Sequence, residues 1–176
     1  MSELSGLAVI RRTRIEDARG FLSRVYSADT TVLGKPIVQI NHTLTRRVGT
    51  VRGMHFQWPP HCEAKLVTCL RGEVFDVAVD LRRNSPSFLR WHAERLSGGN
   101  LRSLLIPEGF AHGFQTLTYN CELLYLHTAA YAPSAEGAVS ALDPSLAIEW
   151  PLEISEMSDR DRHHPMLTAE FKGIEL

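Results

Sequence analysis

The sequence contains few cysteines and none of the paired spacings that cysteine chemistry requires. Cys62, Cys69 and Cys121 are the three cysteines among 176 residues, and no CxxC or other zinc-binding pattern joins them. An odd number of cysteines also argues against the disulfide framework that is typical of small secreted domains. We therefore expect free thiols in a reducing compartment and no structural zinc site.

The chain also lacks a strong net charge and a long apolar segment. Its formal net charge is −1 at pH 7, so no overall field attracts nucleic acid or an anionic membrane, although this value does not exclude a local basic pocket. No apolar run approaches the roughly 18 residues needed to span a bilayer, and the first residues lack the basic and apolar regions of a signal peptide. These absences predict a soluble cytoplasmic protein with no nucleic-acid or membrane partner.

What the sequence does contain is a regular alternation of turn residues and short apolar segments. Turn signals recur at short intervals, as in Gly34-Lys35-Pro36, Pro59-Pro60 and Gly98-Gly99-Asn100. This rhythm predicts an all-β sandwich or barrel. The predicted strands are residues 38–45, 50–57, 65–71, 74–81, 90–96, 103–106, 113–117 and 122–129.

Helix signals are weak, and no shift in composition marks a domain boundary. Residues 28–32 fit a turn or a short helix, and the tail from about Glu153 fits another. We expect a single domain over residues 1–176. Its N-terminal strand (within residues 1–30) and its C-terminal tail (residues 150–176) should pack on the barrel or extend it.

The clearest predicted strand, residues 74–81, carries two acids on one face. Alternation places Asp76 and Asp80 together, opposite the apolar side chains of Phe75 and Val77. A solvated outer face explains the two acids, and a polar pocket inside a barrel is the rival explanation. The sequence leaves both open.

A basic and polar cluster lies in the predicted strand at residues 50–57. It contains Arg52, His55 and Gln57 within six consecutive residues. Strict alternation puts Arg52 and His55 on opposite faces, but Gly53 between them is typical of a β-bulge that turns both side chains inward. A lone histidine on a strand is usually structural, so the pattern alone does not settle the role of His55.

A second histidine follows a turn in Pro107-Glu108-Gly109-Phe110-Ala111-His112. This PxGxxH spacing resembles the second motif of cupin barrels, in which a proline–glycine turn feeds a strand that begins with an inward histidine. Many cupins bind a metal through an HxH in their first motif, but the corresponding stretch here reads His55-Phe56-Gln57. Metal sites normally gather three or four N, O or S ligands, so we expect no catalytic metal.

Without a metal, His55 and His112 suit acid–base chemistry. Neutral histidine is a good base near physiological pH. Lys65 begins the next predicted strand and can stabilise a developing oxyanion, and Tyr125 on a later strand can return a proton. Such a set favours proton abstraction next to a ketone through an enolate. No GxGxxG opens a helix and no P-loop occurs, so no nicotinamide or ATP fingerprint is present.

Several blocks in a fixed order make the sequence similar to one enzyme family. They are Asp17-Ala18-Arg19-Gly20-Phe21, Gln39-Ile40-Asn41-His42, residues 52–57, Ala64-Lys65-Leu66-Val67, residues 72–82, residues 106–114, Leu124-Tyr125, Asp143-Pro144 and Ile148-Glu149-Trp150-Pro151. Over residues 17–161 the chain resembles the dTDP-4-dehydrorhamnose 3,5-epimerase family.

The resemblance implies a fold, an activity and an assembly. The fold is an all-β cupin double-stranded β-helix, or jelly-roll barrel, with short peripheral helices. Family members epimerise a nucleotide-linked 4-keto-6-deoxyhexose, such as a dTDP-linked sugar of deoxysugar biosynthesis, at C3, C5 or both. They need no metal or redox cofactor, because the substrate's own ketone provides the acidity. The resemblance also implies a homodimer in which an N-terminal strand completes the neighbour's barrel.

Individual roles follow from the same resemblance. His55 matches the proton-abstracting base, Asp161 its aspartate partner, Lys65 the lysine near the ketone or enolate oxygen, and Tyr125 the proton donor on the opposite ring face. Arginine suits a diphosphate because its planar fork fits phosphate oxygens. The expected substrate-binding residues are Arg19 and Arg52 on the diphosphate side, Arg24, Gln39 and Asn41 on the nucleotide side, and Gln57, His112, Glu136 and Arg160 around the pocket.

Three positions depart from the family pattern. Arg24 stands where a glutamate is common, which leaves the preferred nucleotide base open. Leu126 follows Tyr125 where a lysine is frequent, and Ala141-Leu142 replaces a frequent Trp-Asn pair. These departures indicate a pathway other than the commonest rhamnose route and leave single or double epimerisation open.

Other functions remain as alternatives. A non-catalytic sugar-nucleotide-binding cupin would not need the acid–base set, and a metal-dependent cupin oxygenase or isomerase would need the missing HxH. A nucleotide-sugar 3,4-ketoisomerase shares the barrel but fits the blocks less well. The simplest expectation for the remaining histidines is a solvent-facing position for His61, His92, His163 and His164.

Overall fold

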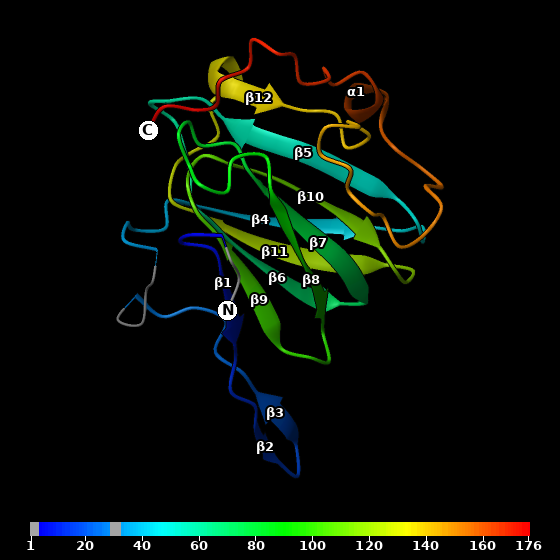
Figure 1. Cartoon of the computed structure of the whole chain (residues 1–176). Coiled ribbons are helices and arrows are strands. Elements are labelled where there is room, and N and C mark those ends of the chain that lie inside the picture. The colour runs from blue at the N-terminus through cyan, green and yellow to red at the C-terminus, as the bar shows by residue number, and fades with distance from the viewer. Residues whose placement is uncertain (1–3, 29–32) are drawn as a thin grey trace.

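The computed structural model describes residues 4–28 and 33–176, and antiparallel strands are the main regular secondary structure in these residues (Figure 1). Each predicted strand is present, with ends shifted by at most three residues. The elements are β1 (Ala8–Arg11), β2 (Ile15–Asp17), β3 (Gly20–Leu22), β4 (Gln39–Thr45), β5 (Val51–Gln57), β6 (Lys65–Arg71), β7 (Glu73–Asp80), β8 (Trp91–Ser97), β9 (Arg102–Ile106), β10 (Phe110–Thr116), β11 (Cys121–His127), the 3-10 turn η2 (Pro133–Ala135), β12 (Glu136–Ala138) and α1 (Asp159–Arg162).

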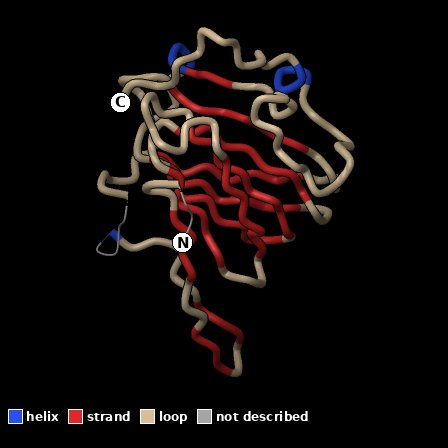
Figure 2. The backbone as a smooth tube through the Cα atoms, in the orientation of Figure 1, coloured by secondary structure: helices blue, strands red, loops and turns tan. Residues whose placement is uncertain are grey.

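Two five-stranded sheets form the barrel. Their strand orders are β1-β9-β6-β11-β4 and β12-β5-β10-β7-β8, and Figure 2 shows these strands in red, joined by loops and turns in tan. Side chains from both sheets meet in a core that includes Val74, Ala78, Leu104 and Leu123, each with no exposed surface. This arrangement confirms the predicted all-β, cupin-type jelly roll.

The acid-bearing face of β7 points into the barrel. Asp76 and Asp80 have no exposed surface, and Val74 and Ala78 of the same face belong to the inner core. Asp80 is neutralised by Arg82, whose Nη2 lies 2.7 Å from its Oδ2. The interpretation of a polar interior is therefore confirmed, and the solvated outer face is wrong.

The C-terminal tail covers the outer face of the sheet that contains β5, β10 and β7. Met157 and Ile174 of this tail, together with Leu146 just before it, are buried in a second core with Val77 and Val79. In Figure 1 the tail, coloured orange to red, passes along β5 and carries α1 beside it. This sheet has apolar side chains on both faces, and the tail covers the face that does not point into the barrel.

Helical structure in residues 4–28 and 33–176 is confined to short turns. α1 begins at the cap residue Ser158, whose side-chain oxygen accepts a hydrogen bond from Asp161 N at 3.0 Å, and the acids Asp159 and Asp161 in its first turn suit a helix N-terminus. The helix predicted in the tail is therefore present, while residues 29–32 of the other predicted turn lie outside the described residues. Among the described residues, no helix is long and apolar enough to cross a membrane.

The N-terminal residues extend the molecule in two ways. β1 pairs with β9 at the edge of one sheet. The hairpin of β2 and β3 then projects away from the barrel (Figure 1) and exposes Ile15, Phe21 and Leu22. An exposed apolar hairpin of this kind is typical of a surface that contacts another chain.

The cysteines match the expectation for free thiols. Cys62, Cys69 and Cys121 are buried and unpaired. Burial, assisted by the nearby Cys121, raises the pKa of the Cys69 thiol to about 12. A protonated, buried thiol is a poor nucleophile, so we assign no chemistry to Cys69.

Candidate active site

The residues predicted to carry chemistry line one cavity between the two sheets. Its volume is about 210 Å³, and its walls include Arg52 and His55 of β5, Lys65 of β6, His112 of β10 and Tyr125 of β11. Four strands that are separated in the sequence thus present their polar side chains to the same space. The small size suits a sugar ring rather than a whole nucleotide sugar.

A bulge in β5 turns both Arg52 and His55 toward this cavity. His55 pairs with His112, but the next pairing joins Arg52 with Phe114, so the register shifts between them. Gly53 makes the shift possible, because its φ is 132° and a Cβ there would lie 2.5 Å from the Cα of a glycine on β10. The hypothesis of a bulge is confirmed.

His55 forms a hydrogen-bonded pair with Asp161 of α1. The two atoms His55 Nε2 and Asp161 Oδ1 are 2.8 Å apart, and the Asp161 side chain is only 6% exposed. Burial alone raises the pKa of Asp161, but the hydrogen bond and charge of His55 outweigh burial and lower it overall. An ionised Asp161 favours the tautomer of His55 with the proton on Nε2, which leaves Nδ1 to accept a proton.

His164 lies against this pair, and its predicted position on the surface is wrong. Its side chain is 8% exposed, and its Nε2 is 3.7 Å from Asp161 Oδ1. The rings of His55 and His164 pack edge to face with centroids 5.2 Å apart. Burial and the neighbouring His55 lower the pKa of His164, so it is mostly neutral at pH 7. His92 is also half-buried, whereas His61 and His163 are exposed as expected.

A second histidine–aspartate pair lies deeper in the barrel. His112 Nε2 is 2.8 Å from Asp76 Oδ1, and the two side chains are 6% and 0% exposed. The His112 ring packs edge to face against Tyr125, with centroids 5.9 Å apart. Asp76 therefore fixes a ring that forms the floor beside the tyrosine.

Tyr125 keeps its proton throughout the physiological range. Burial raises its pKa well above the usual value, and the negative charge of Asp76 adds to this effect. A tyrosine that stays protonated inside a cavity is available as a proton donor.

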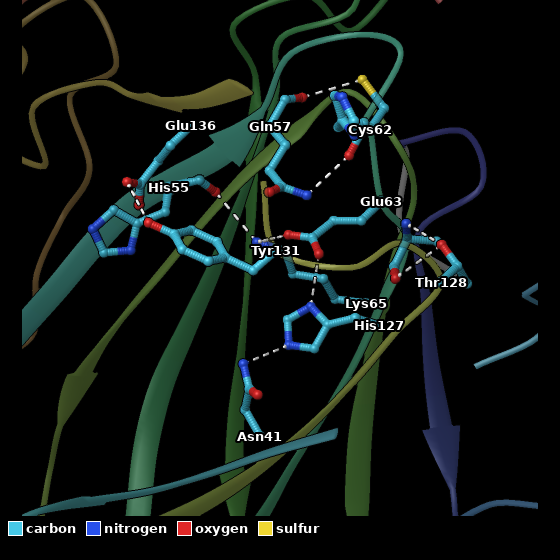
Figure 3. A network of polar contacts seen from close by, with 12 residues as sticks. Asn41, His55, Gln57, Cys62, Glu63, Lys65, His127, Thr128, Tyr131 and Glu136 are labelled. Atoms are coloured by element: carbon cyan, nitrogen blue, oxygen red, sulfur yellow. Dashed lines mark hydrogen bonds and ion pairs between the residues drawn. The ribbon is translucent and has the colours of Figure 1, made fainter. Parts of the chain in front are cut away.

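Lys65 belongs to a buried polar network that sequence reasoning missed (Figure 3). Its Nζ lies 3.0 Å from Glu63 Oε1, and the other carboxylate oxygen, Oε2, lies 2.8 Å from His127 Nδ1. All three side chains are less than a tenth exposed. The sequence did contain a signal for this network. Glu63 precedes Lys65 by two residues and His127 follows Tyr125 by two, and residues two apart on a strand point to the same face.

The network continues to Asn41 and Gln39, two of the three residues predicted on the nucleotide side. Asn41 Nδ2 lies 3.3 Å from His127 Nε2, and Gln39 Nε2 donates to Asn41 Oδ1 at 3.2 Å. Asn41 also lines the cavity. Asn41 of β4 therefore reaches the cavity itself, and Gln39 is joined to the network through Asn41.

Glu136 and Arg160 stand at the mouth of the site. They form an ion pair with each other, and the Glu136 carboxylate also accepts a hydrogen bond from Tyr131 Oη at 3.0 Å. Arg160 lines an adjoining cavity of about 560 Å³ that shares Arg52 and His55 with the smaller one. The larger space leads outward from His55 and contains several arginines, which suits a negatively charged portion of a ligand.

Three predicted site residues lie elsewhere in this chain. Arg19 is on the projecting hairpin, 89% exposed and paired with Asp17 at 2.6 Å. Arg24 lines a separate cavity of about 360 Å³ against the outer side of β6 and β9. Gln57 is 5% exposed, and its amide bonds to the backbone of His61, Ala130 and Ala132. A single chain therefore does not bring them into the cavity beside His55.

Three groups in the site have the chemistry of metal ligands. His55, Asp161 and His164 offer ligand atoms within 4.8 Å of one another. Two imidazoles and a carboxylate form a donor set that catalytic metal sites use. Two of these atoms are already at hydrogen-bonding distance from each other. The expectation that no metal takes part stays a prediction.

Comparison with known proteins identifies relatives over almost the whole chain. A family model described as dTDP-4-dehydrorhamnose 3,5-epimerase matches residues 1–169. The dTDP-4-dehydrorhamnose 3,5-epimerase of Salmonella typhimurium is 44% identical over 156 residues, which cover 86% of this chain and 85% of the relative. The dTDP-4-dehydrorhamnose 3-epimerase of Streptomyces niveus is 39% identical over 177 aligned residues, 98% of this chain and 84% of the relative.

Solved structures agree with these relatives. The dTDP-6-deoxy-D-glucose-3,5-epimerase from Legionella pneumophila, in complex with dTDP-4-keto-L-rhamnose, superposes with a TM-score of 0.90 at 36% identity. The match covers 98% of this chain and 95% of that one. By its sequence, its barrel and these matches, the chain belongs to the dTDP-4-dehydrorhamnose 3,5-epimerase family.

Proposed function

We propose that the chain epimerises a dTDP-linked 4-keto-6-deoxyhexose at C3, C5 or both, without a metal or redox cofactor. The observation that carries this proposal is the single cavity in which the His55–Asp161 pair, Lys65 and Tyr125 meet. A binder that performed no chemistry would have no need of a base, an oxyanion partner and an acid in one place.

His55 is the proposed base. Its Nδ1 takes the proton from the carbon next to the C4 ketone, and the electron pair of the broken C–H bond forms the C=C bond of an enolate. The negative charge moves to the C4 oxygen. Asp161, ionised and buried beside Nε2, stabilises the imidazolium that results.

Lys65 and Tyr125 complete the reaction. The Lys65 ammonium donates a hydrogen bond to the enolate oxygen, where charge develops. Tyr125 then gives its phenolic proton to the same carbon from the opposite face, and the enolate electrons form the new C–H bond as the ketone returns. Tyrosinate and imidazolium recover their starting states by proton exchange with water.

Nucleotide binding involves a second copy of the chain in this proposal. Arg52 and Arg160 face the larger cavity, while Arg19 lies on the hairpin that projects from the barrel. Exposed apolar residues of the hairpin and of β4, among them Phe21, Leu22 and Ile40, suit burial against a partner. In a homodimer the hairpin of one subunit brings Arg19 to the neighbour's site, and Arg24 lies just after the hairpin on the segment that returns to the barrel.

Deuterium exchange tests the reaction directly. The protein is incubated with dTDP-4-keto-6-deoxyglucose in D2O, and deuterium at C3 and C5 is followed by NMR. We expect exchange and inversion in the wild type, and loss of both in a folded His55→Ala variant. Exchange retained in that variant, or absent in the wild type, would contradict the proposal.

The same measurement decides how many centres are inverted. The relative from Streptomyces niveus is named a 3-epimerase, while the relative from Salmonella typhimurium is named a 3,5-epimerase. Exchange at C3 alone identifies a mono-epimerase, and exchange at both carbons identifies double epimerisation.

A further inference from the structure

Lys65 reaches the cavity as a buried charge with a dedicated counter-charge. Its side chain is 8% exposed, and a buried ammonium is costly unless it is paired and hydrogen-bonded. Glu63, 9% exposed, lies 3.0 Å away and precedes the first residue of β6 by two positions. A second contact, from Lys65 Nζ to the His55 carbonyl oxygen at 3.5 Å, directs the ammonium toward the strand of the base.

Every hydrogen bond in the surrounding network is consistent with donors that point toward Glu63. Gln39 donates to Asn41. Asn41 Nδ2 faces His127 Nε2, and His127 Nδ1 faces the Glu63 carboxylate (Figure 3). This order requires a neutral His127 with its proton on Nδ1. The Glu63 carboxylate then accepts one hydrogen bond from His127 and one from Lys65, and these two bonds fix its orientation.

The electrostatics agree with an ionised Glu63. Burial alone raises the pKa of Glu63, but the hydrogen bonds from His127 and Lys65 and the positive charge of Lys65 outweigh burial and hold the pKa below its usual value. The ring of His127 also stacks on Tyr125, with centroids 6.1 Å apart and an interplanar angle of 18°. His127 thus contacts both Tyr125 and the Glu63 carboxylate that pairs with Lys65.

We propose that Glu63 and His127 are positioning residues for Lys65. Glu63 holds the ammonium at the cavity wall as its counter-charge, and His127 fixes the Glu63 carboxylate, so that one ammonium proton is presented to the substrate's C4 oxygen. This inference rests on the function proposed above. It adds two residues that touch neither the reacting carbon nor the oxygen but set where the positive charge lies.

A positioning role for Glu63 predicts a result that a merely structural role does not predict. If Glu63 acts through Lys65, replacing Glu63 matters only while Lys65 is present. We expect Glu63→Gln to lower kcat by about 10- to 100-fold, somewhat less than the roughly 10²–10³-fold cost of deleting an oxyanion donor. KM and the affinity for dTDP, measured by calorimetry, should stay within about threefold, because nucleotide contacts are unchanged.

A double-mutant cycle with Lys65→Met is the decisive measurement. In the Lys65→Met background, Glu63→Gln should cause little further loss of kcat. An equal loss in both backgrounds, or wild-type kcat in the single Glu63→Gln variant, would overturn the proposal. Glu73→Gln serves as the matched control, because Glu73 forms an exposed ion pair with Arg95 at 2.9 Å outside the cavity lining.

A second pair of variants keeps the test valid if Glu63→Gln does not fold. His127→Asn retains a hydrogen-bond donor near the position of Nδ1, whereas His127→Leu removes it. We expect kcat of the Asn variant to stay several-fold above that of the Leu variant. Equal values for the two would contradict the proposed role of His127.

A readout that needs no turnover separates this inference from the proposed function. A buried, paired ammonium exchanges its protons slowly, so the Lys65 Nζ signal should be visible by NMR in the wild type and lost in Glu63→Gln. An unchanged signal in the variant refutes the positioning. Loss of the signal in the variant, together with a wild type that exchanges no substrate proton, refutes the proposed function and leaves the positioning intact.

Discussion

Replacing Asp161 by Asn isolates the contribution of one carboxylate to the proposed base. Asp161 Oδ1 is 2.8 Å from His55 Nε2, and the aspartate side chain is 6% exposed. A hydrogen bond to a charged group contributes about 1.5–3 kcal/mol. At about 1.4 kcal/mol per factor of ten, losing it when His55 becomes an imidazolium slows the reaction by about 10- to 150-fold. His55 is 35% exposed, so solvent screening places the expected loss in the lower part of this range.

The amide also disturbs the orientation of the ring. Asp161 accepts from His55 through Oδ1 and from the backbone N–H of Gly53 through Oδ2. An asparagine has a single oxygen, so it satisfies one of these donors and turns its own N–H groups toward the other. We therefore expect a fall of about 10²-fold in kcat with KM nearly unchanged, because substrate contacts are retained.

Stability supplies an independent check with a definite pH dependence. The pKa of Asp161 is lowered in the folded state, so its stabilisation is present above the unfolded value of about 3.9 and disappears as pH falls through the folded value. The free energy of unfolding of the wild type should exceed that of Asp161→Asn at pH 7, and the difference should shrink below about pH 4.

Two results would refute this reasoning. One is a folded Asp161→Asn variant with kcat within about threefold of the wild type, which would mean that the carboxylate does not support the base. The other is a stability difference that is the same at pH 7 and at pH 3. Chemical denaturation at both pH values and steady-state kinetics are sufficient measurements.

Three further predictions concern the acid, the bulge and the hairpin. Tyr125→Phe should reduce formation of the epimer by about 10²-fold, while wash-in of solvent deuterium on the His55 face persists; loss of both would contradict separate roles. Gly53→Ala should lower the free energy of unfolding by about 1–3 kcal/mol, because a Cβ would lie 2.5 Å from a backbone Cα, whereas Gly99→Ala has only a contact at 3.9 Å and should be nearly neutral. Mixing inactive Arg19→Ala and His55→Ala chains should restore activity through mixed dimers with one intact site; no recovery after subunit exchange would argue against a shared site.

The long strands were predictable because their pattern is local. Alternating apolar residues bounded by turn residues define β7 or β11 without knowledge of the partner strands. The short strands β2, β3 and β12 escaped prediction, and the predicted N-terminal strand could not be given bounds, because three or four residues carry little periodicity. Pairing with distant strands holds β1 and β12 in place, whereas β2 and β3 pair with each other. Propensity decides little over such lengths.

The candidate site was predictable where it lies on strands and unpredictable where it depends on distant contacts. Gly53 suggested the inward direction of Arg52 as one of two alternatives, but the close approach of Gly53 to Gly113 of β10 that decides between them involves a distant strand. His164 lies in an irregular tail without periodicity, so its burial against His55 gave no signal. Arg19 lies on a hairpin whose partner is another chain in the proposed assembly.

The C-terminal tail both covers the sheet and places Asp161 beside His55. It covers the outer face of the sheet through Met157 and Ile174, and between them it carries Asp161 to His55. Asp161 follows every strand in the chain, so a ribosome completes the barrel strands before it adds the partner of the base. A chain without this segment would expose the apolar outer face of the sheet and would at the same time lack the carboxylate that orients the proposed base.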